Sequence, residues 1–240
     1  MANREDWYLK NRGEMTFSGY EKDLLFNQEE ELFEAKLQQY PNAYDIKVYR
    51  YYETEDAKKV LETRAIVQSL AGYKNINNSR KILARKSFYL RTGDIIEFKN
   101  NKWLTTDWVN RQRGTDDYSS LMLCNHEVSF TKQTKNSDGE VDDFGRPKYN
   151  ITTEEIKLPC YYTTNVMDSY ENGFVNLPDN RAKAYIQYTD LLKVGDEINV
   201  AGDNYRIYGI DESYMVYGDT YIGYKYGVLI LTLEAPVTTT

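Results

Sequence analysis

One hairpin pattern occurs twice in this chain, and it constrains the fold more than any other feature. Residues 91–109 read RTGDIIEFKNNKWLTTDWV, and residues 193–211 read KVGDEINVAGDNYRIYGID. Each copy places Gly-Asp two residues after a basic residue, then a short alternating apolar run, a polar turn and a second run. Gly can supply the positive φ of a turn and Asp can hydrogen-bond the nearby backbone, so each copy predicts a β-hairpin. The motif alone indicates no function, because such hairpins occur in many unrelated β proteins.

The repeat extends on both sides of the hairpin. NSRKILARKSFYLRTGD (78–94) aligns with DNRAKAYIQYTDLLKVGD (179–196). Further strand-like segments match as pairs: IVQSL (66–70) with IKLPCYY (156–162), and SSLMLC (119–124) with GVLILTLE (227–234). Five elements recur in the same order, in a unit of about seventy to eighty residues, near the size of a small five-stranded barrel. The sequence therefore predicts a mainly β protein with two tandem small β-barrel or sandwich modules.

The remaining segments complete the predicted organisation. YEKDLLFNQEEELFEAKLQQY (20–40) has apolar residues at helical spacing and is followed by Pro41, which predicts a short N-terminal helical segment. The polar, turn-rich residues 131–155 are predicted to form a protruding loop or hairpin that joins the modules. The predicted boundaries are a helical segment 1–42, a first β module 43–135, a connecting loop 136–155 and a second β module 156–240.

Composition indicates a soluble chain made in a cytoplasm. The hydrophobic fraction is 41%, enough to build cores. No apolar run approaches the ~18 residues of a membrane helix, and the N-terminus MANREDWYLK lacks the apolar core of a signal peptide. With only two cysteines in 240 residues, reduced thiols are expected. We expect no membrane partner.

No constellation of residues indicates an enzyme. Walker-type, GxGxxG, GxSxG and HExxH motifs are all missing from the sequence. Cys124, His126 and Cys160 could supply three zinc ligands, but no fourth ligand is evident, which favours core cysteines beside a surface or interface histidine. The sequence therefore predicts no catalytic residue, no cofactor and no metal.

Charge is unevenly distributed and suggests two surfaces of opposite sign. Residues 61–135 carry 13 basic and 7 acidic side chains, whereas residues 136–240 carry 8 and 17. Solvated strand faces would give the same pattern, and the overall pI of about 5.0 argues against a nucleic-acid reader. Tyrosine-rich segments near the C-terminus suggest an assembly surface or ordinary strand tyrosines. The candidate partner-interface residues are Arg85, Lys86, Arg111, Arg113, Tyr217, Tyr221 and Tyr224.

Taken together, several segments resemble one known family. RTGDIIEFKNNKWLTTDWV with the following LCNHEVSF, then IKLPCYY, VNLPDNRAKAYIQYT and GVLILTLE, resemble a head–tail connector (neck, head-closure or stopper) protein of tailed bacteriophages of Gram-positive bacteria. The similarity spans roughly residues 60 to 234. It implies a non-enzymatic subunit that joins a ring beneath the portal and holds or passes DNA, with no catalytic residue to carry over.

The resemblance also implies partners and a location. These are copies of the chain in a ring, a portal or adaptor protein above, a tail terminator or tail tube protein below, and double-stranded DNA in non-specific proximity. The protein would lie in the neck of the virion, assembled in the bacterial host cytoplasm. An acidic wall would keep DNA from sticking, so the loop residues Asp138, Glu140, Asp142 and Asp143, or the acidic second module, are expected to face the channel. A tail or baseplate protein, and a soluble module that binds carbohydrate or single-stranded nucleic acid, stay as alternatives.

Overall fold

The computed structural model describes most of the chain after residue 30. The described residues are 31–50, 60–69, 78–107, 109, 116–141, 147–164, 181–216 and 225–235. Within these ranges, the side chains of Lys86, Asp116 and residues 134–141 and 147–150 lie outside the description.

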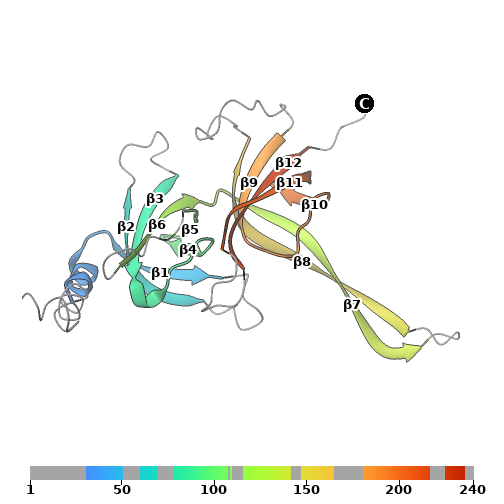
Figure 1. Cartoon of the computed structure of the whole chain (residues 1–240), viewed down its shortest axis with the longest axis horizontal. Helices are drawn as coiled ribbons and strands as arrows, with labels where there is room; N and C mark the ends of the chain where they lie inside the picture. Colours follow the sequence, from blue (N-terminus) through green and yellow to red (C-terminus); the bar gives the residue numbers. More distant parts are fainter. Residues whose placement is uncertain are drawn as a thin grey trace, which may run out of the picture.

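The first six strands form a closed barrel (Figure 1). Strand order around the barrel is β1-β2-β3-β6-β5-β4, and the pairing of β1 with β4 closes it. Alternating side chains such as Ile46 and Val48 point inward and are buried, as half-buried strands require. The strands are β1 (Ala43–Tyr49), β2 (Leu61–Ser69), β3 (Ser79–Arg85), β4 (Ile95–Phe98), β5 (Asn101–Thr105) and β6 (Asp116–Leu123), with a 3-10 turn η2 (Lys86–Phe88) after β3.

The next six strands form a second closed barrel with its own core. Strand order is β10-β11-β12-β9-β8-β7, and β10 pairs with β7 to close it. Residues including Val128, Ile186, Ile198 and Leu231 fill the interior. The strands are β7 (His126–Val141), β8 (Pro147–Thr163), β9 (Arg181–Gln187), β10 (Glu197–Val200), β11 (Asp203–Val216) and β12 (Tyr226–Glu234).

The two barrels have the same connectivity. Read from the Gly-Asp hairpin, the first barrel runs β4-β5-β6-β3-β2-β1 and the second runs β10-β11-β12-β9-β8-β7. All five elements that recur in the sequence fall on equivalent strands, and β1 and β7 add a sixth pair without a recognised sequence match. The predicted mainly β class with two small β modules is therefore confirmed, as two six-stranded barrels.

The repeated hairpins also share their hydrogen bonds. The amide of Gly93 donates to the Thr105 carbonyl and the amide of Gly195 to the Ile207 carbonyl, both at 2.8 Å. In each copy the Asp carboxylate accepts the amide of the residue three positions before it, 3.0 Å for Arg91 to Asp94 and 2.7 Å for Lys193 to Asp196. Sequence and backbone geometry therefore repeat together.

The predicted N-terminal helix is described over residues 31–39, and its earlier part lies outside the described residues. Phe33 and Leu37 are buried against Ile66 of the first barrel, so the helix covers part of its outer face. No helix in the described ranges is long and apolar enough to cross a membrane.

The segment between the predicted modules differs from a connecting loop. Strand β7 enters the second barrel at His126, and β7 and β8 pair continuously from His126↔Cys160 to Ser137↔Tyr149. Residues 136–141 and 147–155 therefore form strands, which agrees with the predicted hairpin and not with the predicted loop. Residues 126–135, which the predicted boundaries place in the first module, belong to a strand of the second barrel. Polar composition left a loop and a hairpin equally open, because backbone hydrogen bonds can hold two strands whatever the polarity of their side chains.

Candidate functional site: a barrel junction and a projecting arm

The two barrels meet through an unusually close backbone contact. Gly93, in the first Gly-Asp hairpin, lies against Gly227 at the start of β12, and both have positive φ, +89° and +143°. A Cβ added to Gly93 would lie 2.1 Å from the Gly227 carbonyl oxygen, which no side chain could tolerate without movement. Glycine at these two positions therefore lets the barrels approach to backbone contact.

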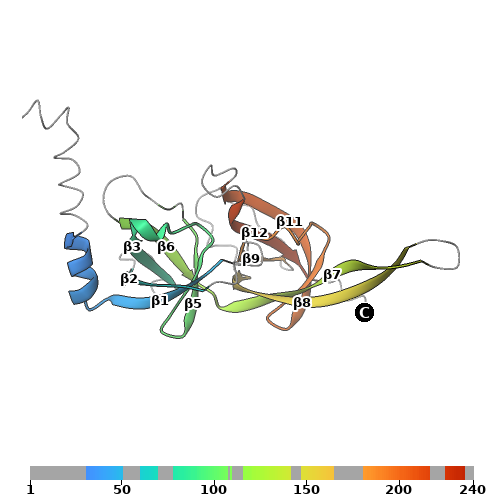
Figure 2. The same ribbon diagram turned by 90° about the horizontal axis from the view of Figure 1, so that it is seen from below.

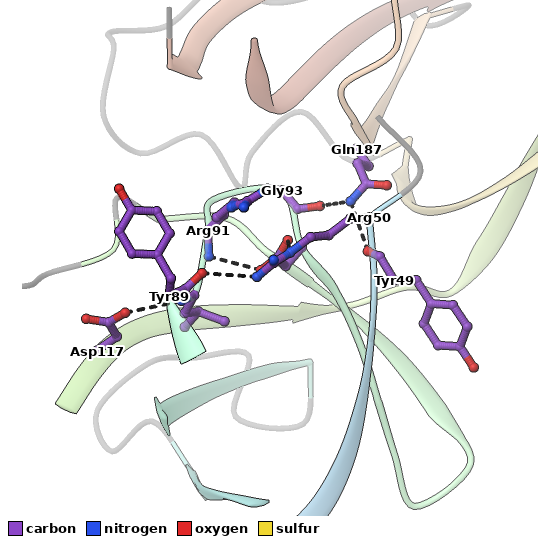
Figure 3. Close-up of polar contacts among 9 residues, drawn as sticks. Tyr49, Arg50, Tyr89, Arg91, Gly93, Asp117 and Gln187 are labelled. Carbon is purple, nitrogen blue, oxygen red and sulfur yellow. Dashed lines mark hydrogen bonds and ion pairs between the residues drawn. The ribbon is translucent and has the colours of Figure 1, made fainter. Parts of the chain in front are cut away.

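A buried glutamine links the same hairpin to the second barrel (Figure 3). Gln187, at the end of β9, is fully buried and its side-chain nitrogen donates to the carbonyl oxygens of Gly93 and, at 3.2 Å, Tyr49. One amide group thus satisfies two carbonyls of the other barrel. Buried polar groups that are paired in this way specify one arrangement of their surroundings.

An apolar cluster completes the junction. Ile95 and Leu104 from the first barrel are buried with Val228 from the second. Tyr49, Cys124, Tyr185 and Tyr214 pack around them. The junction therefore has a small core of its own, contributed by both barrels.

A buried ion pair supports the hairpin from the first barrel's side. Arg50 Nε and Nη2 donate to the two carboxylate oxygens of Asp94 at 2.9 and 3.1 Å, and Nη2 also donates to the Tyr89 carbonyl at 3.0 Å. Arg50 and Asp94 are 5% and 0% exposed. The equivalent Asp196 is only half-buried. The duplicated turn is therefore reinforced by a bidentate pair in the copy that lies at the junction.

The two barrels are joined by a connection of only two residues. Strand β6 ends at Leu123 and β7 begins at His126. The Asn125 side chain donates to the Tyr162 carbonyl and accepts from the Tyr162 amide, both at 2.7 Å, so the connection is attached to β8. Lys102 and Glu127 add an exposed ion pair across the junction at 3.5 Å.

The projecting element is the far part of the β7–β8 hairpin, which we call the arm and define as residues 131–141 and 147–155. It extends away from the second barrel in both views, at the end of the molecule opposite the helix (Figures 1 and 2). Its side chains at 131–133 and 151–155 are all exposed. The arm is therefore available for contact along its length near the barrel.

The cysteines and the histidine are not arranged as a metal site. His126 and Cys160 are register partners, yet no group of three or more potential ligands is found among the described residues. Burial raises the pKa of both Cys124 and Cys160 to about 12, so the thiols are protonated at neutral pH. The raised pKa disfavours the thiolate, the form of cysteine that acts as a nucleophile.

The predicted partner-interface residues are only partly described. Arg85 forms a bidentate ion pair with Glu34 of the helix, with Nη2 to Oε2 at 2.8 Å, and donates to Thr63 at 3.2 Å. Lys86 falls on η2 without a described side chain. Arg111, Arg113, Tyr217, Tyr221 and Tyr224 lie outside the described residues. Arg85 thus has a partner inside its own chain, and an intermolecular role for the set stays a prediction.

The predicted channel-facing acidic residues belong to the arm or its tip. Asp138 and Glu140 fall on β7, but their side chains lie outside the description. Asp142 and Asp143 lie outside the described residues. The structure thus places the first two on the element that projects furthest from the barrels.

Sequence reasoning missed the residues of the junction. Gly93 was recognised as a turn glycine, but Gly227, Gln187 and Arg50 carried no motif. A signal was available in Gly227, the second residue of an otherwise apolar strand, where a side chain would be expected to pack. The partners of Gln187 and Arg50 lie 39 or more residues away along the chain, so spacing could not indicate them.

Most of the second barrel is similar to a protein domain family found in phages. Residues 145–234 match the family described as YomX C-terminal domain, a phage-associated domain. This similarity indicates a phage origin. The match begins just before β8 and ends with β12, and it covers less than half of the chain. No curated protein and no solved structure matches the chain.

Proposed function

We propose that this chain is a non-enzymatic structural subunit of a tailed-phage virion, which joins a ring at the head–tail interface below the portal and helps to retain or pass DNA. The observation that carries the proposal is the match of residues 145–234 to a phage-associated domain. The resemblance of segments within residues 60–234 to head–tail connector proteins suggests the place of the chain in the particle, at the head–tail interface.

The junction supports a role in assembly. A ring subunit must hold the surfaces that meet its neighbours at a constant angle, or the ring does not close. The Gly93–Gly227 contact, Gln187 and the shared apolar cluster hold the barrels as one body. The helix and the arm then lie at opposite ends of that body (Figure 2).

The proposal includes specific neighbours. Copies of the chain form the ring, a portal or adaptor protein lies above, and a tail terminator or tail tube protein lies below. Arg111 and Arg113 meet an acidic neighbour, and Asp138 and Glu140 face the channel, where their charge repels DNA phosphates.

Immunogold electron microscopy of a lysate from the native source tests the proposal. We expect gold-labelled antibody against this chain at the junction between capsid and tail. Label at the tail tip would instead make the chain a tail or baseplate protein. If no particle carries label, the assembly function is wrong, and a ligand screen of the purified chain becomes the next experiment.

A further inference from the structure

The arm has two strand edges with no neighbouring strand in the described structure. Strand β7 pairs with β10 only at Val128 and Ser129, and β8 pairs with β9 only from Cys160 onward. Between these limits and the tip, β7 and β8 pair with one another alone among the described residues. At ~3.3 Å per residue, β7 offers roughly 35 Å of such edge beyond the barrel.

The arm is not held by burial within its own chain. Every described side chain at 131–133 and 151–155 is exposed, including Ile151 at 59%. An isolated two-stranded ribbon is marginally stable in water, and a third strand gives it additional hydrogen bonds and side-chain contacts. An arm of this length therefore gains stability from another strand.

The two edges differ in charge near the barrel. Strand β7 carries Lys132, and β8 carries Glu154 in register with it. Both side chains are exposed, and neither forms an ion pair with another described residue. Glu155, also on β8, is already paired with Lys157 at 3.4 Å. At this register position, next to the barrel, β7 thus carries a positive side chain and β8 a negative one.

We propose that the arms of adjacent copies of this chain pair edge to edge, with β7 of one copy beside β8 of the next. Pairing of β7 with β7 would bring Lys132 near its own counterpart, and pairing of β8 with β8 would do the same for Glu154. Like charges across a contact are unfavourable, whereas β7 beside β8 joins opposite charges. The resulting contact is head-to-tail, the type that generates rings.

This inference deepens the proposed function by naming the surface through which copies meet. It rests on that function only for the expectation that copies assemble. Because β7 and β8 are antiparallel within each arm, arms that project in the same direction extend one antiparallel sheet from copy to copy.

Two single charge reversals test the contact. Lys132→Glu gives both strands of the arm an acidic side chain at this register position, and Glu154→Lys gives both strands a basic one. We expect each variant alone to self-associate about tenfold more weakly than the wild type, and their equimolar mixture to recover wild-type association. The mixture alternates opposite charges between copies, whereas the like charges within each arm remain, so recovery isolates the contact between copies.

The readout is the apparent dissociation constant from sedimentation of the full chain up to about 1 mM. Lys36→Glu, a reversal of an exposed lysine on the N-terminal helix at the end of the molecule opposite the arm, is the matched control and should associate as the wild type does. Thermal unfolding checks that both barrels remain folded in each variant. Recovery on mixing supports the contact. A monomeric wild type, a single variant that associates normally, or a mixture that fails to recover overturns it.

These outcomes are distinct from those of the microscopy. If gold label lies at the capsid–tail junction but the wild-type chain does not self-associate, the arm contact is wrong and the proposed function still holds. If the mixture of variants recovers association but no particle carries label, the arm contact holds and the proposed function is wrong.

Discussion

Gly93 and Gly195 occupy equivalent positions in the two hairpins but have different surroundings. Both have positive φ, +89° and +98°. A Cβ on Gly93 would meet backbone of the other barrel at 2.1 Å, whereas a Cβ on Gly195 would meet only the end of the Arg206 side chain at 3.7 Å. The turn requires glycine in both copies, and the junction adds a second requirement in one.

Alanine at the two positions should therefore have unequal effects. We expect Gly93→Ala to lower the free energy of unfolding by about 3 kcal/mol, from backbone strain plus overpacking against Gly227. Gly195→Ala should cost about 1 kcal/mol, because only the strain applies. Urea unfolding of both variants measures the difference. Equal losses would show that the close approach of the barrels contributes nothing to stability.

At the scale of the element, the helix is attached to the first barrel by an apolar contact and an ion pair. Phe33 and Leu37 are buried on the barrel surface, and Glu34 pairs with Arg85 of β3. The hydrogen bond from Arg85, and to a lesser degree its charge, holds the pKa of the Glu34 carboxyl below its ordinary value, despite an opposing effect of burial.

This shift predicts a pH dependence for the attachment. Because the pKa of Glu34 is lower in the folded chain than in the unfolded chain, the pair stabilises the helix above the ordinary Glu pKa of about 4.3. That contribution is lost as pH falls through the folded-state pKa. NMR titration of the Glu34 carboxyl measures the pKa, which Arg85→Gln should return toward the ordinary value. An unchanged pKa in Arg85→Gln would contradict the assigned cause.

On the scale of the whole molecule, the junction should make the two barrels unfold together. Each barrel has its own core, but Ile95, Leu104 and Val228 form a cluster that neither completes alone. Gln187 adds polar links to Gly93 and Tyr49. Coupling between the barrels therefore depends on a small number of contacts.

Replacing Gln187 with Ala should weaken that coupling. The buried carbonyls of Gly93 and Tyr49 lose this donor, at a cost of about 1–3 kcal/mol. Trp7, Trp103 and Trp108 all precede the second barrel, so tryptophan fluorescence reports the first half of the chain, whereas far-UV circular dichroism reports both barrels. We expect the two probes to give coincident unfolding curves for the wild type and separate curves for Gln187→Ala. Coincident curves in the variant would mean that Gln187 does not couple the barrels.

The local parts of this fold can be predicted from the amino-acid sequence. The Gly-Asp turns, the alternation of Ile46 and Val48, and the order of five recurring strands follow from φ preferences and side-chain periodicity, which neighbouring residues set. Other features are evident only in the tertiary structure: the closure of β1 on β4 and of β7 on β10, and the meeting of Gly93 with Gly227. These features depend on backbone hydrogen bonds and contacts between residues far apart in the chain, and such pairings leave no period or spacing in the sequence.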